Sequence, residues 1–191
     1  MSPFAPSRRR ALLRMLAALA MLTLACDAWA KPRVLGWLEW AWLEPDHIRL
    51  KAKLDTGART SSIDADEIEL FERDGEQWVR FRVPLSERPD DSTYDKDVHY
   101  ELPLAGRKKI KDHVLEPARR YVVEMELCIG GRMFTTPMTL ADRSRFNYPL
   151  LLGRAALQGR MMVDPAQKYT ADRSCPKPAT ARTTKPADAS P

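Results

Sequence analysis

The chain has 191 residues, of which 44% are hydrophobic and 30% are charged, and its formal net charge is +5. This length suits one domain with extensions. Four arginines and one aspartate lie within residues 1–30, so without that segment the net charge falls to +2. Such a weak positive charge gives no case for nucleic acid binding, and we expect none.

Residues 1–30 have the organisation of an export signal. Arg8, Arg9, Arg10 and Arg14 form a basic head, Leu12 to Ala25 is an apolar run, and Ala28-Trp29-Ala30 supplies a small-x-small cleavage pattern. The run is shorter than the roughly 20 residues of a membrane span. We therefore expect cleavage after Ala30 and a periplasmic or otherwise exported protein. The alternative is an uncleaved anchor, and we expect no other contact with a membrane.

Two further export features are present in weaker form. Ser7-Arg8-Arg9 is similar to a twin-arginine signal, although Ala11 is a poor match. Cys26 follows Thr23-Leu24-Ala25, which only partly fits a lipoprotein site. Twin-arginine export and lipid anchoring are therefore not favoured.

Residues 31–169 are expected to form one all-β domain, because short alternating stretches bounded by turn residues recur and no long helical periodicity occurs. Asp74-Gly75 and Gly130-Gly131 predict tight turns. Arg154 to Gln158 is long enough for one helical turn near the C-terminal end. The expected strands are Val34–Leu43, Ile48–Leu54, Ser61–Leu70, Trp78–Val83, Tyr121–Ile129, Met133–Leu140, Leu150–Leu152 and Met161–Val163, and a hairpin is expected from His99–Leu104 and Lys108–Val114.

Four further features of the chain carry expectations of their own. Pro84 to Asp97 is polar and is interpreted as an exposed loop, with a mobile lid as the alternative. Residues 170–191 lack large apolar side chains and are expected to be disordered. Cys128 and Cys175 either form a disulfide or remain a buried and a free thiol. Trp37, Trp40 and Trp42 suit core packing or dimer contacts better than a partner surface.

The motif Leu54-Asp55-Thr56-Gly57-Ala58 ends an alternating strand, and Leu150-Leu151-Leu152-Gly153-Arg154 follows about a hundred residues later. Together they resemble the catalytic loop and the later apolar-Gly-Arg motif of retropepsin-like aspartic proteases. The runs Lys51–Ser62, Asp142–Pro149 and Gly159–Pro165 are similar to a bacterial branch that has also carried the name ATP-dependent zinc protease. The resemblance covers residues 36 to about 169.

This resemblance implies a closed or partly open acid-protease β-barrel with one short helix near its C-terminal end. It also implies an aspartic-type endopeptidase that acts on peptides or proteins without a cofactor, with Asp55 as the catalytic acid. Two nearby carboxyl groups share one proton, so one can activate water while the other donates to the scissile carbonyl. Since the chain carries one such motif, a homodimer is expected to supply the pair.

The neighbouring residues receive supporting roles. Thr56 is expected to hold the two loops together across the axis, Gly57 to allow close approach of substrate, and Ala58 to keep the wall small. The resemblance implies that Leu152 and Gly153 pack beneath the loop. It also implies that Arg154 anchors that layer through an ion pair or hydrogen bonds to carbonyl groups.

Arg59 departs from the viral pattern, which has an acidic residue there. It either lowers the pKa of the acid pair and selects an acidic or C-terminal substrate group, or pairs with Asp64 or Asp66.

Other functions have less support in the sequence. Asp55 could form a simple Asx turn, and a retropepsin-like dimer could bind peptides without cleaving them. His47, His99 and His113 form no zinc motif, and no ATP-binding Gly-rich loop is present. A zinc-dependent protease is therefore the less favoured alternative, and we expect no metal.

Overall fold

The computed structural model describes residues 32–85, 97–109, 119–171 and 175. The chain divides into Met1–Lys31 and Pro32–Pro191, and the architecture below is that of the second unit. The predictions for the export signal, for most of the 84–97 loop and for most of the tail concern residues outside the described part, and they stay predictions.

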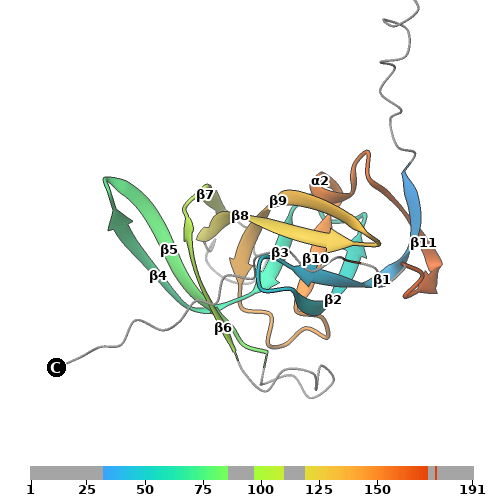
Figure 1. Ribbon diagram of the computed structural model, residues 1–191, viewed down its shortest axis with the longest axis horizontal. Helices are drawn as coiled ribbons and strands as arrows, with labels where there is room; N and C mark the ends of the chain where they lie inside the picture. Colours follow the sequence, from blue (N-terminus) through green and yellow to red (C-terminus); the bar gives the residue numbers. More distant parts are fainter. Residues whose placement is uncertain (1–31, 86–96, 110–118, 172–174, 176–191) are drawn as a thin grey trace, which may run out of the picture. The chain divides into compact units, whose positions relative to one another are not determined.

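The described residues are mostly strands, as the sequence predicted (Figure 1). No helix in these ranges is long and apolar enough to cross a bilayer. The elements are β1 (Arg33–Leu43), β2 (Ile48–Asp55), β3 (Ser61–Asp64), β4 (Asp66–Arg73), β5 (Glu76–Val83), β6 (Val98–Pro103), β7 (Gly106–Lys109), β8 (Arg119–Ile129), β9 (Arg132–Ala141), β10 (Leu150–Gly153), α2 (Arg154–Leu157) and β11 (Met161–Lys168).

Six strands close into a barrel in the order β1-β2-β10-β3-β9-β8. Closure comes from a second pairing of β1, whose Trp42 and Leu43 face Cys128 and Leu127 of β8. Strand β11 adds to β1 in parallel, and β7 adds to β8. The predicted acid-protease barrel with one short C-terminal helix is confirmed.

Strand β2 shows how the sequence builds this barrel. Its burial alternates without a break, because Leu50, Ala52 and Leu54 point into the core while Lys51 and Lys53 point outward. Fully burying a leucine side chain stabilises a fold by about 1.5–3 kcal/mol. The alternation therefore fixes the register of β2, since a slip by one residue would place the lysines in the core.

Strands β4, β5 and β6 form a separate three-stranded sheet. The predicted turn at Asp74-Gly75 is present, and both residues have positive φ, 53° and 80°, as a tight hairpin turn requires. Val79 and Phe81 of β5 are fully buried in the same core as the barrel residues.

The predicted hairpin from His99–Leu104 and Lys108–Val114 is wrong. Strand β6 pairs with β5, whereas β7 pairs with β8. The amide of Leu104 donates to the carbonyl of Gln77 (2.9 Å), and the next amide, of Ala105, donates to Val122 (2.8 Å). Two successive residues thus bond to different sheets, so the turn-like Ala105-Gly106 is a crossing point between them.

The segment after β11 is fastened to the barrel. Cys128 and Cys175 form a disulfide, which settles the alternative that the sequence left open. The fully buried carboxylate of Glu39 accepts hydrogen bonds from the amides of Gly36 (2.7 Å), Thr170 (2.9 Å) and Ala171 (3.0 Å), and from the Thr170 hydroxyl (2.7 Å). Residues placed in the tail by the sequence therefore contact the barrel.

Candidate active site

Asp55 is the last residue of β2, and the chain leaves the barrel there through the loop 56–60. Strand β10 runs parallel to β2 and brings Gly153 opposite Asp55. The two sequence motifs, about a hundred residues apart in the chain, are therefore neighbours in space.

The Asp55 carboxylate has partners on both oxygens. Its Oδ1 accepts from the amides of Gly57 (2.9 Å) and Ala58 (3.1 Å), and its Oδ2 lies 3.1 Å from Nζ of Lys53. Burial is the largest single influence and raises the pKa of Asp55, but the Lys53 hydrogen bond, the two amides and the Lys53 charge together hold it below 3.8. Asp55 is thus a partly exposed acid whose two carboxylate oxygens both have hydrogen-bonding partners.

Arg154 braces the loop that follows Asp55. Its guanidinium donates to the carbonyls of Thr56 and Gly57, each at 2.8 Å, and its amide donates to the carbonyl of Ala58 (2.9 Å). The amide of Ala155 continues this pattern with a hydrogen bond to Arg59 (3.1 Å). Arg154 therefore holds the loop through carbonyl groups, one of the two modes that the sequence left open.

Gly153 lies against the same loop. A Cβ on Gly153 would come within 2.6 Å of the carbonyl oxygen of Thr60, so only glycine allows this approach. Leu152 is fully buried beside it. A Cβ on Gly57 would lie 3.2 Å from Oδ1 of Asp55, which is also a tight contact. The structure thus brings together all the predicted site residues from Asp55 to Ala58 and from Leu152 to Arg154.

A buried polar network beneath β3 and β10 was not predicted. Arg143 is only 6% exposed, and it donates to the Ser62 hydroxyl (2.9 Å) and the carbonyl of Tyr148 (3.1 Å). Its amide donates to the carboxylate of Asp64 (2.6 Å). These residues lie within the runs Lys51–Ser62 and Asp142–Pro149 or directly beside them. A charged residue inside such a run was the available signal, but a single sequence could not show that it is buried.

Arg59 is exposed, and the two acids proposed as its alternative partners are engaged elsewhere. Asp64 accepts from the amide of Arg143, and Asp66 pairs with Arg82. The proposal that Arg59 acts on substrate therefore stays open.

Donor groups for a metal do not gather in the described ranges, where no three His, Cys, Asp or Glu side chains could hold an ion together. His47 contacts Glu44 (3.0 Å), and His99 lies 3.9 Å from Glu67. His113 is not among the residues that the structure describes. The zinc alternative thus gains no donor set from the described residues.

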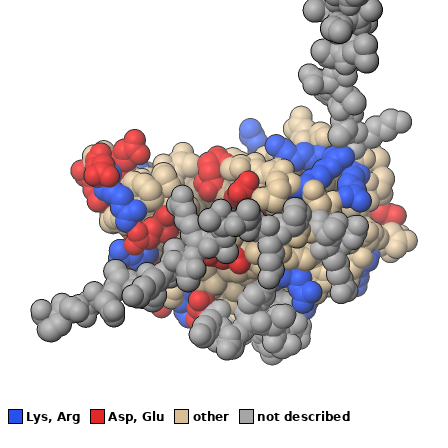
Figure 2. Space-filling view, viewed as in Figure 1, with Lys and Arg blue, Asp and Glu red and all other residues tan. Residues whose placement is uncertain are grey.

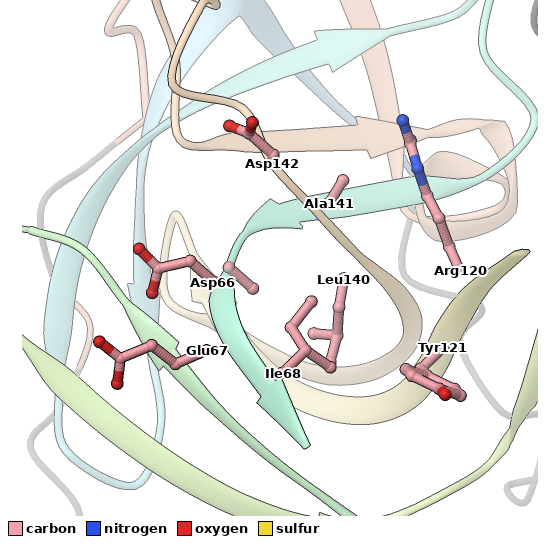
Figure 3. A pocket seen from close by; sticks show the side chains of 9 residues that line it. Asp66, Glu67, Ile68, Arg120, Tyr121, Leu140, Ala141 and Asp142 are labelled. Carbon is pink, nitrogen blue, oxygen red and sulfur yellow. The ribbon is translucent and has the colours of Figure 1, made fainter. Parts of the chain in front are cut away.

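A hollow, shown in Figure 3, has a volume of about 480 Å³ and is lined by none of residues 55–60 or 152–154. Ile68, Tyr121 and Leu140 line it, and Asp66, Glu67, Asp142 and Arg120 surround it. It lies at Ala65, just after the Asp64 end of β3, whereas the opposite end of β3, at Ser61, adjoins Gly153. This hollow is therefore not the site that Asp55 belongs to.

Comparisons with known proteins agree with this geometry. Residues 34–174 match the family model described as RimB-like, retropepsin-like aspartic endopeptidase RimB. A solved structure of Lpg0085 from Legionella pneumophila, a protein of unknown function, has a TM-score of 0.62 and 35% identity, covering 73% of this chain and 98% of that one.

Two curated relatives carry the name probable alpha-L-glutamate ligase. The protein from Shewanella pealeana is 35% identical over 120 residues, and that from Desulfotalea psychrophila is 35% identical over 136 residues. The matches cover 63% and 70% of this chain but only 25% and 28% of those proteins. This chain therefore spans about a quarter of the length of these relatives.

Proposed function

Because the chain belongs to the RimB-like family of retropepsin-like aspartic endopeptidases, we propose that it hydrolyses peptide bonds with an acid pair made of Asp55 from two copies of the chain. The observation that carries this proposal is the Asp55 carboxylate, held by the amides of Gly57 and Ala58 in a loop that Arg154 braces. A fixed carboxylate at the end of a rigid strand is what acid–base catalysis needs.

The proposed reaction follows from a shared proton. The ionised carboxylate takes a proton from a water molecule as the water oxygen attacks the peptide carbonyl, and the neutral carboxyl donates its proton to the carbonyl oxygen. On collapse of the tetrahedral intermediate the carbon–nitrogen bond breaks. The carboxyl group that took the water's proton passes it to the leaving amine, and the other carboxylate takes a proton from a hydroxyl of the intermediate, which restores the pair. The pair titrates as a unit, so neither carboxyl has a permanent role in the free enzyme.

The proposal is tested by assaying the purified protein and its Asp55→Asn variant on casein and a peptide library across acidic and neutral pH. We expect cleavage by the wild type, inhibition by a pepstatin-type compound, and loss of activity in Asp55→Asn. Cleavage that only a chelator stops would instead indicate a metal-dependent protease. Peptide binding by both forms without cleavage would indicate a binding module on the same fold.

We also propose that the substrate carries acidic side chains. Lys53 contacts Asp55, Arg154 braces the loop after Asp55, and Arg59 is exposed near the end of that loop. Lys and Arg side chains also gather on the face over α2 (Figure 2). The relatives named as glutamate ligases point to glutamyl peptides. Faster cleavage of a glutamate-containing peptide than of its glutamine counterpart, reduced in Arg59→Gln, would support this preference, and equal rates would contradict it.

We propose further that the protein works after export, in an oxidising compartment. The disulfide between Cys128 and Cys175 supports this, because such bonds persist outside the reducing cytosol. Cell fractionation with mass spectrometry of the N-terminus tests both export and cleavage after Ala30.

A further inference from the structure

Lys53 and Asp55 lie on the same face of β2. Residues two apart in a strand point to the same side, about 6.6 Å apart along the chain, and both side chains face outward from the barrel. The Lys53 ammonium bends toward Asp55 and lies 3.1 Å from Oδ2. This is the carboxylate oxygen that the loop amides leave open, since Gly57 and Ala58 both bond to Oδ1.

We propose that Lys53 is a positioning residue that sets the charge state of the acid pair, by placing a cation on the oxygen of Asp55 that faces away from the loop. This inference rests on the proposed function, because it assigns to Lys53 control of the same site. Both Lys53 residues of a dimer would stand beside the pair and favour its ionised forms.

The chemistry of the pair explains the consequence. Two adjacent carboxyl groups hold a proton tightly because both cannot be ionised without repulsion. A cation next to each group offsets part of that repulsion, so both macroscopic pKa values of the pair fall. Lys53 therefore moves the pH range in which the pair holds one proton toward acid.

Other charged groups near Asp55 act differently. Arg154 directs its guanidinium to the carbonyls of Thr56 and Gly57 rather than to the carboxylate. Arg59 is exposed at the far end of the loop. Asp164 of β11 pairs in register with Gly36 of β1. Its carboxylate accepts a hydrogen bond from the amide of Ala166 in its own strand (2.9 Å). Lys53 is thus the cation in direct contact with the Asp55 carboxylate.

The chain offers a matched control for Lys53. Lys51 lies on the same face of β2, two residues before Lys53, and its ammonium lies 5.7 Å from the centre of the Trp40 ring. Replacing Lys51 by methionine removes the same charge from the same strand, at a position that is not in contact with Asp55. Lys53→Arg keeps the charge and should retain wild-type behaviour.

The first measurement is the titration of the Asp55 carboxyl by carbon-13 NMR in the purified protein. We expect the macroscopic pKa values that this titration reports to rise by about one unit in Lys53→Met and to change little in Lys51→Met or Lys53→Arg. An Asp55 titration that is the same in Lys53→Met and wild type overturns the proposal. This measurement does not depend on whether the protein cleaves peptides.

The second measurement is the pH dependence of kcat/KM for the Asp55-dependent cleavage. Since loss of the cation raises both pKa values of the pair, both limbs of the profile should move to higher pH by about one unit in Lys53→Met. A uniform fall in activity with unmoved limbs would show that Lys53 is merely structural and overturn the proposal. Absence of any Asp55-dependent cleavage would count against the proposed function, and the titration would still decide the charge coupling.

Discussion

At the scale of single residues, the candidate site depends on glycine where two backbones meet. Gly153 follows the apolar run of β10 and lies against Thr60, with no room for a side chain. Gly106 is a useful contrast, because a Cβ there would meet no atom within 4 Å. The same substitution should therefore have different effects at the two positions.

We predict that Gly153→Ala destabilises the fold by about 1–3 kcal/mol, because the added methyl group must displace the backbone of Thr60. Gly106→Ala should change the unfolding free energy by less than about 0.5 kcal/mol. Urea unfolding of both variants tests this, and equal stabilities would show that the contact with Thr60 is looser than the structure indicates.

The ionised carboxylate of Asp55 should also contribute to stability in a pH-dependent way. Its pKa in the folded chain lies below its ordinary value of 3.8, so the contribution is present above that value and is lost as the pH falls through the lowered pKa. This holds for the single chain, in which no second carboxyl group shares a proton with Asp55. At dilutions that keep the chain monomeric, we expect Asp55→Asn to be less stable than wild type near neutral pH, and this difference to shrink below about pH 4.

Urea unfolding over a series of pH values measures this difference. Asp74→Asn, in the exposed turn between β4 and β5, serves as the control for the substitution itself. A difference between wild type and Asp55→Asn that does not change down to the acid limit would contradict the assigned contacts of the carboxylate.

At the scale of elements, β3 and β10 support the loop after Asp55, and the buried Arg143 ties β3 to the segment 142–149 that leads into β10. Its guanidinium satisfies a hydroxyl on β3 and a carbonyl just before β10. Removal of the Arg143 side chain would leave its buried hydrogen-bonding partners unsatisfied. The free energy of unfolding lost in this way is larger than the net contribution of the hydrogen bond itself.

We predict that Arg143→Met lowers the unfolding free energy by about 2–4 kcal/mol and reduces activity with it. Arg145→Met is the matched control, because Arg145 is exposed in the same loop and should change stability little. If the two variants unfold alike, Arg143 does not hold these strands together.

The disulfide acts at the same scale, since it joins β8 to the segment after β11 across 47 residues of sequence. We expect the double variant Cys128→Ser/Cys175→Ser to lose about 2–4 kcal/mol of stability. Wild-type protein under reducing conditions should show a similar loss in thermal unfolding. No change in either experiment would mean that the bond does not constrain the fold.

Much of this architecture could be predicted from local patterns. The alternation of apolar and polar residues predicted β2, because a strand that is buried on one face has a sequence period of two. The turns at glycine predicted where neighbouring strands end. The motifs around Asp55 and Arg154, through their resemblance to a known family, predicted which residues would lie together, and Gly153 and Arg154 do lie against the loop after Asp55. Pairings between distant strands were out of reach: β6 and β7 looked like a hairpin, but tertiary contacts send them to different sheets.

The roles of Lys53, Glu39 and Arg143 were also beyond the sequence. Lys53 continues the polar alternation of an amphipathic strand, so nothing marked it as a partner of Asp55 until the geometry was known. Glu39 is in a strand of otherwise exposed or apolar residues, and its burial depends on amides from residues 170 and 171. Hydrogen bonds between residues so far apart in the sequence leave no pattern in the residues around Glu39.

At the scale of the whole molecule, each chain carries one Asp55 loop, and the proposed chemistry needs two. A dimer with a two-fold axis would bring two identical loops together. The two copies would then form one active site, so a subunit without its acid would disable its partner.

Mixing experiments test this directly. Wild type and Asp55→Asn are unfolded, combined in varied proportions and refolded together, and cleavage is measured against the fraction of wild-type chain. If the two Asp55 residues share one site, activity falls as the square of that fraction. A linear fall would show that each chain works with its own acid alone, and it would contradict the shared pair.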